Sequence, residues 1–181
     1  MNDLFLLRSF DPPIEREDVM EMARTGSTCF RLHGVDWQVS LLKSDGTRMF
    51  CHFKGRDAES VRIALMQLDT DMRFLWAGTV HDRSGLTKKE LDQANVLVER
   101  KFETPADLEA IQAREDAGSW CLETYNVSFV RTFFSRDRLN MMCLYNAPDA
   151  ESVRQAQHMA KMPVSQVWSF RAFGPNDLET S

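Results

Sequence analysis

Apolar positions along the chain fall into two repeating patterns, one typical of strands and the other of helices. Residues 4–10 and 96–102 have the length and the aliphatic and aromatic content of strands, and Pro13 or Pro105 ends each one. After each proline, apolar residues three or four positions apart predict a helix with one buried stripe, formed by Val19, Met22, Ala23, Gly26 and Phe30 or by Leu108, Ile111, Gly118 and Leu122. A glycine at the same place in both helices predicts a close approach of each helix to its sheet.

Two more strands, a second helix and a last strand complete each half. In the first half we expect strands near 35–43 and 47–54, joined by a turn at Ser44-Asp45-Gly46, where glycine tolerates a positive φ. The second half has Ser135–Leu139 at the corresponding turn. A second helix is expected to begin at Asp57 or Asp149, because an aspartate side chain can accept a hydrogen bond from a first-turn amide. The last strands are expected at 73–80 and 165–172, each with a tryptophan.

The two halves are copies of one another. An offset of 92 residues aligns 4–80 with 96–172 without a gap and matches 19 of 77 positions, whereas ordinary composition would match roughly five. Asp57–Arg62 and Asp149–Arg154 are identical over six residues. Each copy reads strand, helix, strand, strand, helix, strand, so we predict an α+β fold of two tandem ferredoxin-like βαββαβ repeats with antiparallel four-stranded sheets.

These patterns also predict the domain organisation. The first repeat is expected at 1–80 and the second at 95–173. The linker 81–94 contains Thr87-Lys88-Lys89-Glu90, a capping-box pattern that predicts a short helix. A polar tail, 174–181, is expected to be frayed.

Alternation on the third strand of each repeat separates the two faces of its sheet. Met49, Cys51, Phe53 and their counterparts Met141, Cys143, Tyr145 are apolar in both copies and are expected to face the helices. The opposite set, Phe50, His52, Lys54 with Met142, Leu144, Asn146, is half apolar, which is too apolar for a face left in water. We therefore expect the open faces to pack on each other, or on those of a second chain, as a pseudo-dimeric α+β barrel. The expected partner is the protein itself.

Composition and charge narrow the class of protein. Apolar residues make up 43% and charged residues 27%, which is ordinary for a globular protein. The net charge is −5 and the basic residues are scattered, so we expect neither nucleic acid nor a membrane surface as a partner. The first apolar run is cut by Arg8 and is too short for a signal or a span. Four isolated cysteines fit reduced thiols, and we expect a cytoplasmic protein.

Several side chains are candidates for a ligand site, and each has a structural alternative. Arg8 and Arg100 lie at strand ends in apolar stripes, where either could bind an anion or pair with a glutamate of the second helix. Trp76 and Trp168 could line a pocket or anchor the core. With Phe50 and Met142, these tryptophans are the expected lining of a pocket between sheet and helices.

The candidate metal ligands are His52, Cys51 and His158, since imidazole and thiolate suit divalent transition metals. The four histidines do not recur at the 92-residue offset, which disfavours a duplicated metal site. The cysteines stand at core positions beside Met and Phe, which favours buried, inert thiols. No P-loop, dinucleotide fingerprint, zincin motif or nucleophile elbow occurs.

Residues of the second repeat resemble a known family. The segments that carry the resemblance are Asn95–Phe102, Cys121–Val127, Met142–Arg154, Met162-Pro163 and Val167-Trp168. They are similar to the small bacterial ferredoxin-like domains of the nickel-binding-protein-like family, which is largely of unknown function. The first repeat resembles the family less closely, with Lys54-Gly55-Arg56 where a small residue and proline are usual. The resemblance implies a dimeric α+β barrel and nickel binding, with Gln157, next to His158, at a position where the family often has histidine.

Two functions follow as hypotheses. The first is a non-enzymatic binding module, with nickel or another divalent transition metal as its ligand. The alternative is a cofactor-free enzyme or small-molecule binder of the dimeric α+β barrel type, with an arginine to orient an anionic or oxygenated ligand. No catalytic residue can be assigned from the sequence.

Overall fold

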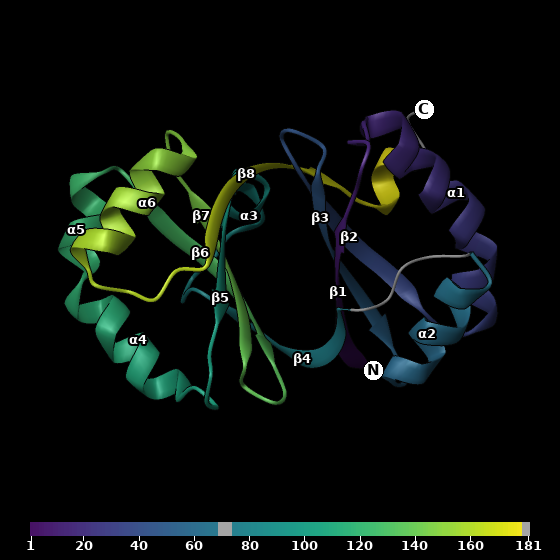
Figure 1. Ribbon diagram of the computed structural model, residues 1–181, viewed down its shortest axis with the longest axis horizontal. Coiled ribbons are helices and arrows are strands. Elements are labelled where there is room, and N and C mark those ends of the chain that lie inside the picture. The colour runs from purple at the N-terminus through teal and green to yellow at the C-terminus, as the bar shows by residue number, and fades with distance from the viewer. Residues whose placement is uncertain (69–73, 179–181) are drawn as a thin grey trace. The chain divides into compact units, whose positions relative to one another are not determined.

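The fold is described from a computed structural model, in which residues 1–68 and 74–178 are described. The elements in chain order are β1 (Asn2–Ser9), α1 (Arg16–Leu32), β2 (Asp36–Lys43), β3 (Arg48–Gly55), α2 (Ala58–Met66), β4 (Leu75–Asp82), α3 (Lys88–Asp92), β5 (Val96–Lys101), α4 (Leu108–Ala117), α5 (Ser119–Thr124), β6 (Ser128–Ser135), β7 (Asn140–Asn146), α6 (Ala150–Met159), β8 (Gln166–Phe173) and the 3₁₀ helix η1 (Pro175–Leu178). The mixed α+β class expected from the sequence is confirmed (Figure 1). Among the described residues, no helix is long and apolar enough to cross a membrane.

The chain forms two compact units. Unit 1 consists of Met1–Gly78 and Arg171–Ser181, and unit 2 of Thr79–Phe170. These bounds differ from the expected repeats, since the boundary falls within β4 and the described residues from Arg171 to Leu178 belong to unit 1. The expected strand 73–80 is observed as β4, Leu75–Asp82, and its first residue, Arg73, lies outside the described residues.

Unit 1 has an antiparallel sheet in the order β4–β1–β3–β2. Strand β1 pairs with β3 and with the first half of β4, and β2 pairs with β3. Helices α1 and α2 cover one face of this sheet (Figure 1). The core between them contains Met49, Cys51 and Phe53 from β3, which confirms the face expected from the alternation.

Unit 2 has a sheet in the order β8–β5–β7–β6, again antiparallel. Met141, Cys143 and Tyr145 of β7 lie in its helix-covered core. The pairing of β6 with β7 shifts register between Phe129 and Arg131. In unit 1 the corresponding shift lies between Trp37 and Val39, 92 residues earlier.

Local capping occurs as the sequence indicates. Asp57 accepts a hydrogen bond from Ser60 N at 2.8 Å, and Asp149 accepts one from Ser152 N at 2.7 Å, at the starts of α2 and α6. These bonds lower the pKa of both aspartates. Helix α3 begins after Thr87, whose backbone N donates to Glu90 at 2.9 Å. The short helix expected in the 81–94 segment is therefore present.

Three expectations about the helices and the tail are wrong. A Cβ on Gly118 would lie 2.9 Å from the Cβ of Ala160, so the glycine allows an approach to the end of α6 rather than to the sheet. Gly118 also separates α4 from α5, where one helix was expected. The tail is not frayed over 175–178, because Leu178 packs against the core of unit 1. Residues 179–181 lie outside the described residues.

Candidate ligand pocket

Each unit places an arginine from its first strand beneath the helices. Arg8 of β1 pairs opposite Met49, and Arg100 of β5 pairs opposite Met141. The two arginines are equivalent at the 92-residue offset. Their surroundings differ, and that difference defines the candidate site.

Arg100 is fully buried and closed in by polar side chains. Its Nη2 donates to Gln157 Oε1 at 2.8 Å, to Tyr145 OH at 3.2 Å and to Glu115 Oε1 at 3.3 Å. Nη1 donates to the carbonyl oxygen of Pro163. Tyr145 OH also donates to Glu115 Oε1, at 3.1 Å. This Arg100 network, formed by Arg100, Glu115, Tyr145 and Gln157, compensates a charge that would otherwise be costly to bury.

Burial also shifts the proton affinities of the network. It raises the pKa of Glu115, against the opposing effect of the Arg100 charge. It raises the pKa of the Tyr145 hydroxyl well above its usual value, with the Glu115 charge acting in the same direction. Tyr145 therefore stays protonated and acts as a hydrogen-bond donor to Glu115.

Unit 1 replaces three members of the network with apolar residues. The 92-residue offset equates Glu115, Tyr145 and Gln157 with Ala23, Phe53 and Leu65. Those three positions offer no side-chain hydrogen-bond acceptor in unit 1. All three residues line a cavity of about 230 Å³ between α1 and the sheet.

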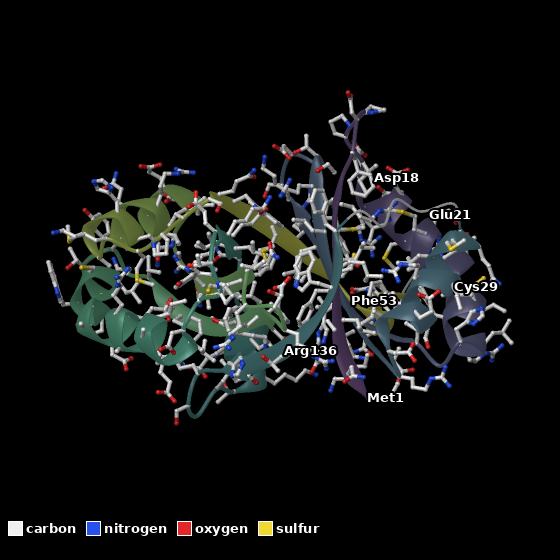
Figure 2. The ribbon with its side chains drawn as sticks, turned by 60° about the horizontal axis from the view of Figure 1, so that its bottom comes forward. Met1, Asp18, Glu21, Cys29, Phe53 and Arg136 are labelled. Carbon is white, nitrogen blue, oxygen red and sulfur yellow. The ribbon has the colours of Figure 1, made fainter. Side chains whose placement is uncertain are left out.

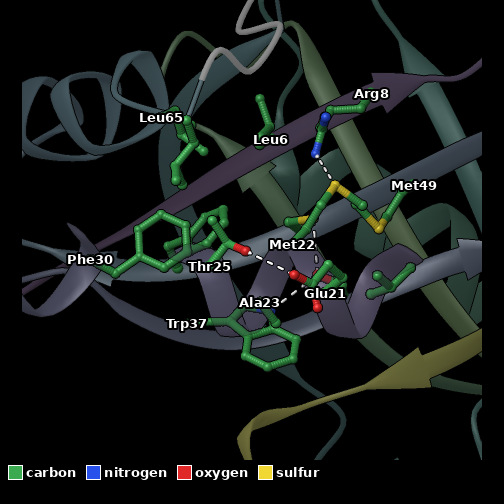
Figure 3. A pocket seen from close by; sticks show the side chains of 15 residues that line it. Leu6, Arg8, Glu21, Met22, Ala23, Thr25, Phe30, Trp37, Met49 and Leu65 are labelled. Carbon is green, nitrogen blue, oxygen red and sulfur yellow. Dashed lines mark hydrogen bonds between the residues drawn. The ribbon is translucent and has the colours of Figure 1, made fainter. Parts of the chain in front are cut away.

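The unit 1 pocket is mainly apolar, with Arg8 on its wall (Figure 3). The residues that line it are Leu6, Arg8, Val19, Glu21, Met22, Ala23, Thr25, Phe30, Trp37, Ser40, Met49, Cys51, Phe53, Leu65 and Leu68. Arg8 Nη1 lies 3.2 Å from the Sδ of Met22, and its guanidinium carbon lies 4.8 Å from the centroid of Phe10. Thioether sulfur is a weak acceptor, so the contact with Met22 is a weak hydrogen bond.

Trp37 and Ser40 also contribute polar groups to the pocket. Trp37 Nε1 donates to Ser40 Oγ at 3.0 Å, and Ser40 Oγ donates to Cys51 Sγ at 3.0 Å. Burial raises the pKa of the Cys51 thiol to about 11. Cys51 is therefore protonated at neutral pH and is not an activated nucleophile.

Glu21 brings a negative charge to the edge of the pocket lining. Glu21 and Asp18 are exposed on α1, Cys29 of the same helix is half-buried, and Phe53 lies on the sheet (Figure 2). Glu21 lies 3.6 Å from Arg24 and accepts a hydrogen bond from Thr25 at 3.4 Å. Its charge is thus partly balanced at the surface.

Unit 2 has a cavity of about 220 Å³ on the same side of its sheet. Five of its lining residues, Ile111, Glu115, Phe129, Thr132 and Met141, are equivalent to residues that line the unit 1 pocket. It also contains His81, Asp82, Glu109 and Gln112, with Leu108 completing the wall. In unit 2 the lining includes the carboxylate of Glu115, which is already paired with Arg100.

Only part of the expected ligand lining faces the unit 1 pocket. Arg8 does, and so does Cys51, which was expected as a metal ligand. Phe50 lies on the opposite face of the sheet, where its ring centroid is 5.8 Å from that of Phe5 and 6.4 Å from that of Trp76. A pocket between sheet and helices is present, but Phe50 and Trp76 do not line it, because strand alternation turns Phe50 away from the helices.

The remaining expected residues lie in unit 2. Met142 is buried, one position from the helix-facing Met141. Trp168 is buried, and its Nε1 donates to Glu99 Oε1 at 2.7 Å. Arg100 does form an ion pair, but with Glu115 of α4 rather than with a glutamate of the second helix. Glu151 of that helix instead pairs with Arg154 at the surface.

The three candidate metal ligands are not brought together. Cys51 lies in the helix-facing core, whereas His52 lies on the other face and contacts Asp3 Oδ1 at 2.7 Å. His158 is exposed on α6 of unit 2. Over residues 1–68 and 74–178, no three His, Cys, Asp or Glu side chains form a group that could hold a metal ion. The donors present therefore do not fit a nickel centre, which takes several such ligands.

Sequence reasoning missed Glu115 and Glu99, two carboxylates that are largely buried. A signal for the first was present, since Tyr145 and Gln157 put polar groups at core positions where unit 1 has Phe53 and Leu65. Buried polar groups need partners. No comparable signal marked Glu99.

Comparisons with known proteins support the fold and one family resemblance. No curated protein matches the chain. Among solved structures, an anthrone oxidase-like protein is 7% identical with a TM-score of 0.53, covering 97% of this chain and 94% of its own. A novel heme-binding protein from Thermus thermophilus is 9% identical with a TM-score of 0.47, covering 99% and 93%. Siroheme decarboxylase NirDL is 11% identical with a TM-score of 0.49, covering 96% and 72%.

At 7% identity, the likeness to the anthrone oxidase-like protein concerns the fold alone. The family match is narrower and falls within unit 2, from β5 to β8. Gln157, within the matched segment, accepts a hydrogen bond of 2.8 Å from Arg100 Nη2. Residues 97–169 match the model of the nickel-responsive protein SCO4226-like family, which confirms the resemblance seen in the second repeat.

Proposed function

We propose that the protein binds a small, mainly apolar molecule in the unit 1 pocket. The observation that carries this proposal is the cavity of about 230 Å³ beneath α1, at the positions where unit 2 has the Arg100 network. Core packing leaves few voids larger than a water molecule. An apolar cavity of about 150 Å³ is enough to bind benzene, so the volume suits a single ring with a short substituent.

The lining supports binding rather than catalysis. Met22, Met49 and Phe30 provide adaptable and aromatic contacts, and few polar groups reach the cavity. Cys51, a nucleophilic side chain in the lining, keeps its proton because burial raises its pKa to about 11. The proposal is thus a small-molecule binder, without an assigned reaction.

A neutral probe tests this function directly. We expect 2-phenylethanol to shift the ¹³C ε-methyl resonances of Met22 and Met49, and the shifts to reach saturation as the probe concentration rises. The Met22→Leu variant assigns the two resonances. Ala23→Leu fills the cavity and is expected to weaken binding of the probe at least about tenfold. The reason is that each methylene of the probe that is no longer buried costs about 0.8 kcal/mol. Ala113→Leu, the same change at an exposed position of α4, is the matched control. Absence of any saturable shift in the wild-type protein, with this probe and with its carboxylate analogue phenylacetate, would refute the proposal.

The family match carries a second candidate, nickel binding. Because the described residues lack a three-donor group, we expect calorimetry with excess Ni²⁺ to give no stoichiometric heat. A one-to-one heat that disappears in His158→Ala would reverse the ranking of the two candidates.

We further propose that the chain is a tandem fusion of two ferredoxin-like repeats. The recurrence of Arg8/Arg100, of the paired strands and of the register shift at an offset of 92 residues supports it. The packing of open sheet faces, within one chain or with a second, stays a prediction from the sequence. Sedimentation equilibrium tests its intermolecular form, for which a dimer is the expected species.

A further inference from the structure

The Arg100 network indicates what chemistry suits Arg8. In unit 2 an arginine at this strand position has a carboxylate partner from α4, with Glu115 Oε1 at 3.3 Å from Nη2. A phenol and an amide oxygen lie at 3.2 and 2.8 Å from the same nitrogen. In unit 1 the residue equivalent to Glu115 is Ala23, which lines the cavity.

We propose that the ligand of the unit 1 pocket is a small aromatic monocarboxylate, whose carboxylate binds Arg8 in the place that Glu115 takes beside Arg100. This inference rests on the proposed function and adds the chemical class of the ligand. Guanidinium and carboxylate form paired, charge-assisted hydrogen bonds, which are about twice as strong as neutral ones. Arg8 and Ala23 both line the cavity, so a carboxylate in the place of the Glu115 side chain lies within reach of the Arg8 guanidinium.

The remainder of the pocket selects the rest of the ligand. Phe30 and Phe53, with ring centroids 5.2 Å apart, and Trp37 present aromatic surface. An apolar cavity of about 150 Å³ binds benzene. The volume of about 230 Å³ in unit 1 is therefore large enough for one ring and a short acid chain. Glu21 opposes an anion from the lining, although its contacts with Arg24 and Thr25 reduce that effect. One negative charge per ligand is therefore favoured over two.

A matched pair of probes isolates the carboxylate. Phenylacetate and 2-phenylethanol differ only in the acid and alcohol group. We expect phenylacetate to bind about 10- to 100-fold more tightly, as a hydrogen bond to a charged group implies. Arg8→Gln is expected to remove this preference and leave the affinity for 2-phenylethanol within about threefold, since only the charge-assisted bonds are lost. Arg62→Gln, at an exposed ion pair of α2, is the control and should retain the preference.

A second variant recreates the unit 2 arrangement. Ala23→Glu places a carboxylate on α1 where Glu115 stands on α4, and is expected to abolish the preference for phenylacetate. Ala113→Glu, at an exposed position of α4, is its control. Folding of each variant is checked by the chemical shifts of methionines outside the pocket.

The outcomes separate the inference from the proposed function. Equal binding of the two probes, or a preference that survives Arg8→Gln, overturns the carboxylate assignment and leaves the proposed function standing. Failure of both probes to bind overturns both. A preference lost in Arg8→Gln and in Ala23→Glu, but kept in the two controls, supports the assignment.

Discussion

Removing the hydroxyl of Tyr145 tests whether the Arg100 network stabilises unit 2. Tyr145→Phe installs the residue that unit 1 has at Phe53 and changes the shape of the core very little. The hydroxyl accepts from Arg100 Nη2 at 3.2 Å and donates to Glu115 Oε1 at 3.1 Å. Its removal therefore takes one bond from a buried cation and one from a carboxylate that is 11% exposed.

The magnitude follows from these two bonds. A hydrogen bond to a charged group contributes about 1.5–3 kcal/mol. The two bonds share one hydroxyl, and the Glu115–Arg100 contact remains, so their effects do not simply add. We expect Tyr145→Phe to lower the free energy of unfolding by about 2–3 kcal/mol.

Urea unfolding monitored by circular dichroism measures this loss, provided that the slope with denaturant is unchanged. The control is Phe53→Tyr, which adds a hydroxyl to the unit 1 pocket near Arg8 and is expected to change stability by less than about 1 kcal/mol. A loss below about 0.5 kcal/mol in Tyr145→Phe would show that the network does not stabilise the fold, and the comparison between the two arginines would lose its energetic basis.

Three further predictions concern single sites. Gly118→Ala is expected to cost about 1–3 kcal/mol in urea unfolding, because the new Cβ would lie 2.9 Å from the Cβ of Ala160; an unchanged midpoint would contradict this. In the native protein, a disulfide reagent at pH 8 is expected to react fastest with Cys29, because Cys29 is half-buried while Cys51 is buried with a pKa of about 11. The fast phase of thiol modification should therefore be absent in Cys29→Ser. Burial raises the pKa of Glu115 above its ordinary 4.5, so the folded protein keeps this proton to higher pH than the unfolded chain does. The stability that results is present below pH 4.5 and is lost as pH rises through the raised pKa. As pH rises through that range, the free energy of unfolding of Glu115→Gln should therefore fall less than that of the wild type. Urea unfolding at each pH measures both values, and parallel pH dependences of the two proteins would contradict a raised pKa of Glu115.

Local patterns were enough to predict most of the fold. Asp57 and Asp149 cap their helices through amides three residues away, and this geometry depends on the adjacent chain alone. The faces of β3 followed from the two-residue period of a strand, with Cys51 toward the helices. Internal comparison of the two halves made these local signals stronger than either half alone.

Only the tertiary structure decided the candidate site. Arg8 was a candidate from the sequence, but its pocket depends on Ala23, from a helix whose placement over the sheet no local pattern determines. Glu115 reaches Arg100 because α4 packs across β5 and β7, a contact set by the topology and not by spacing in the chain. The sequence determined where helices and strands begin and which sides they bury, because those properties depend on near neighbours; the fold decided which polar groups meet, because burial and pairing depend on segments distant in the chain.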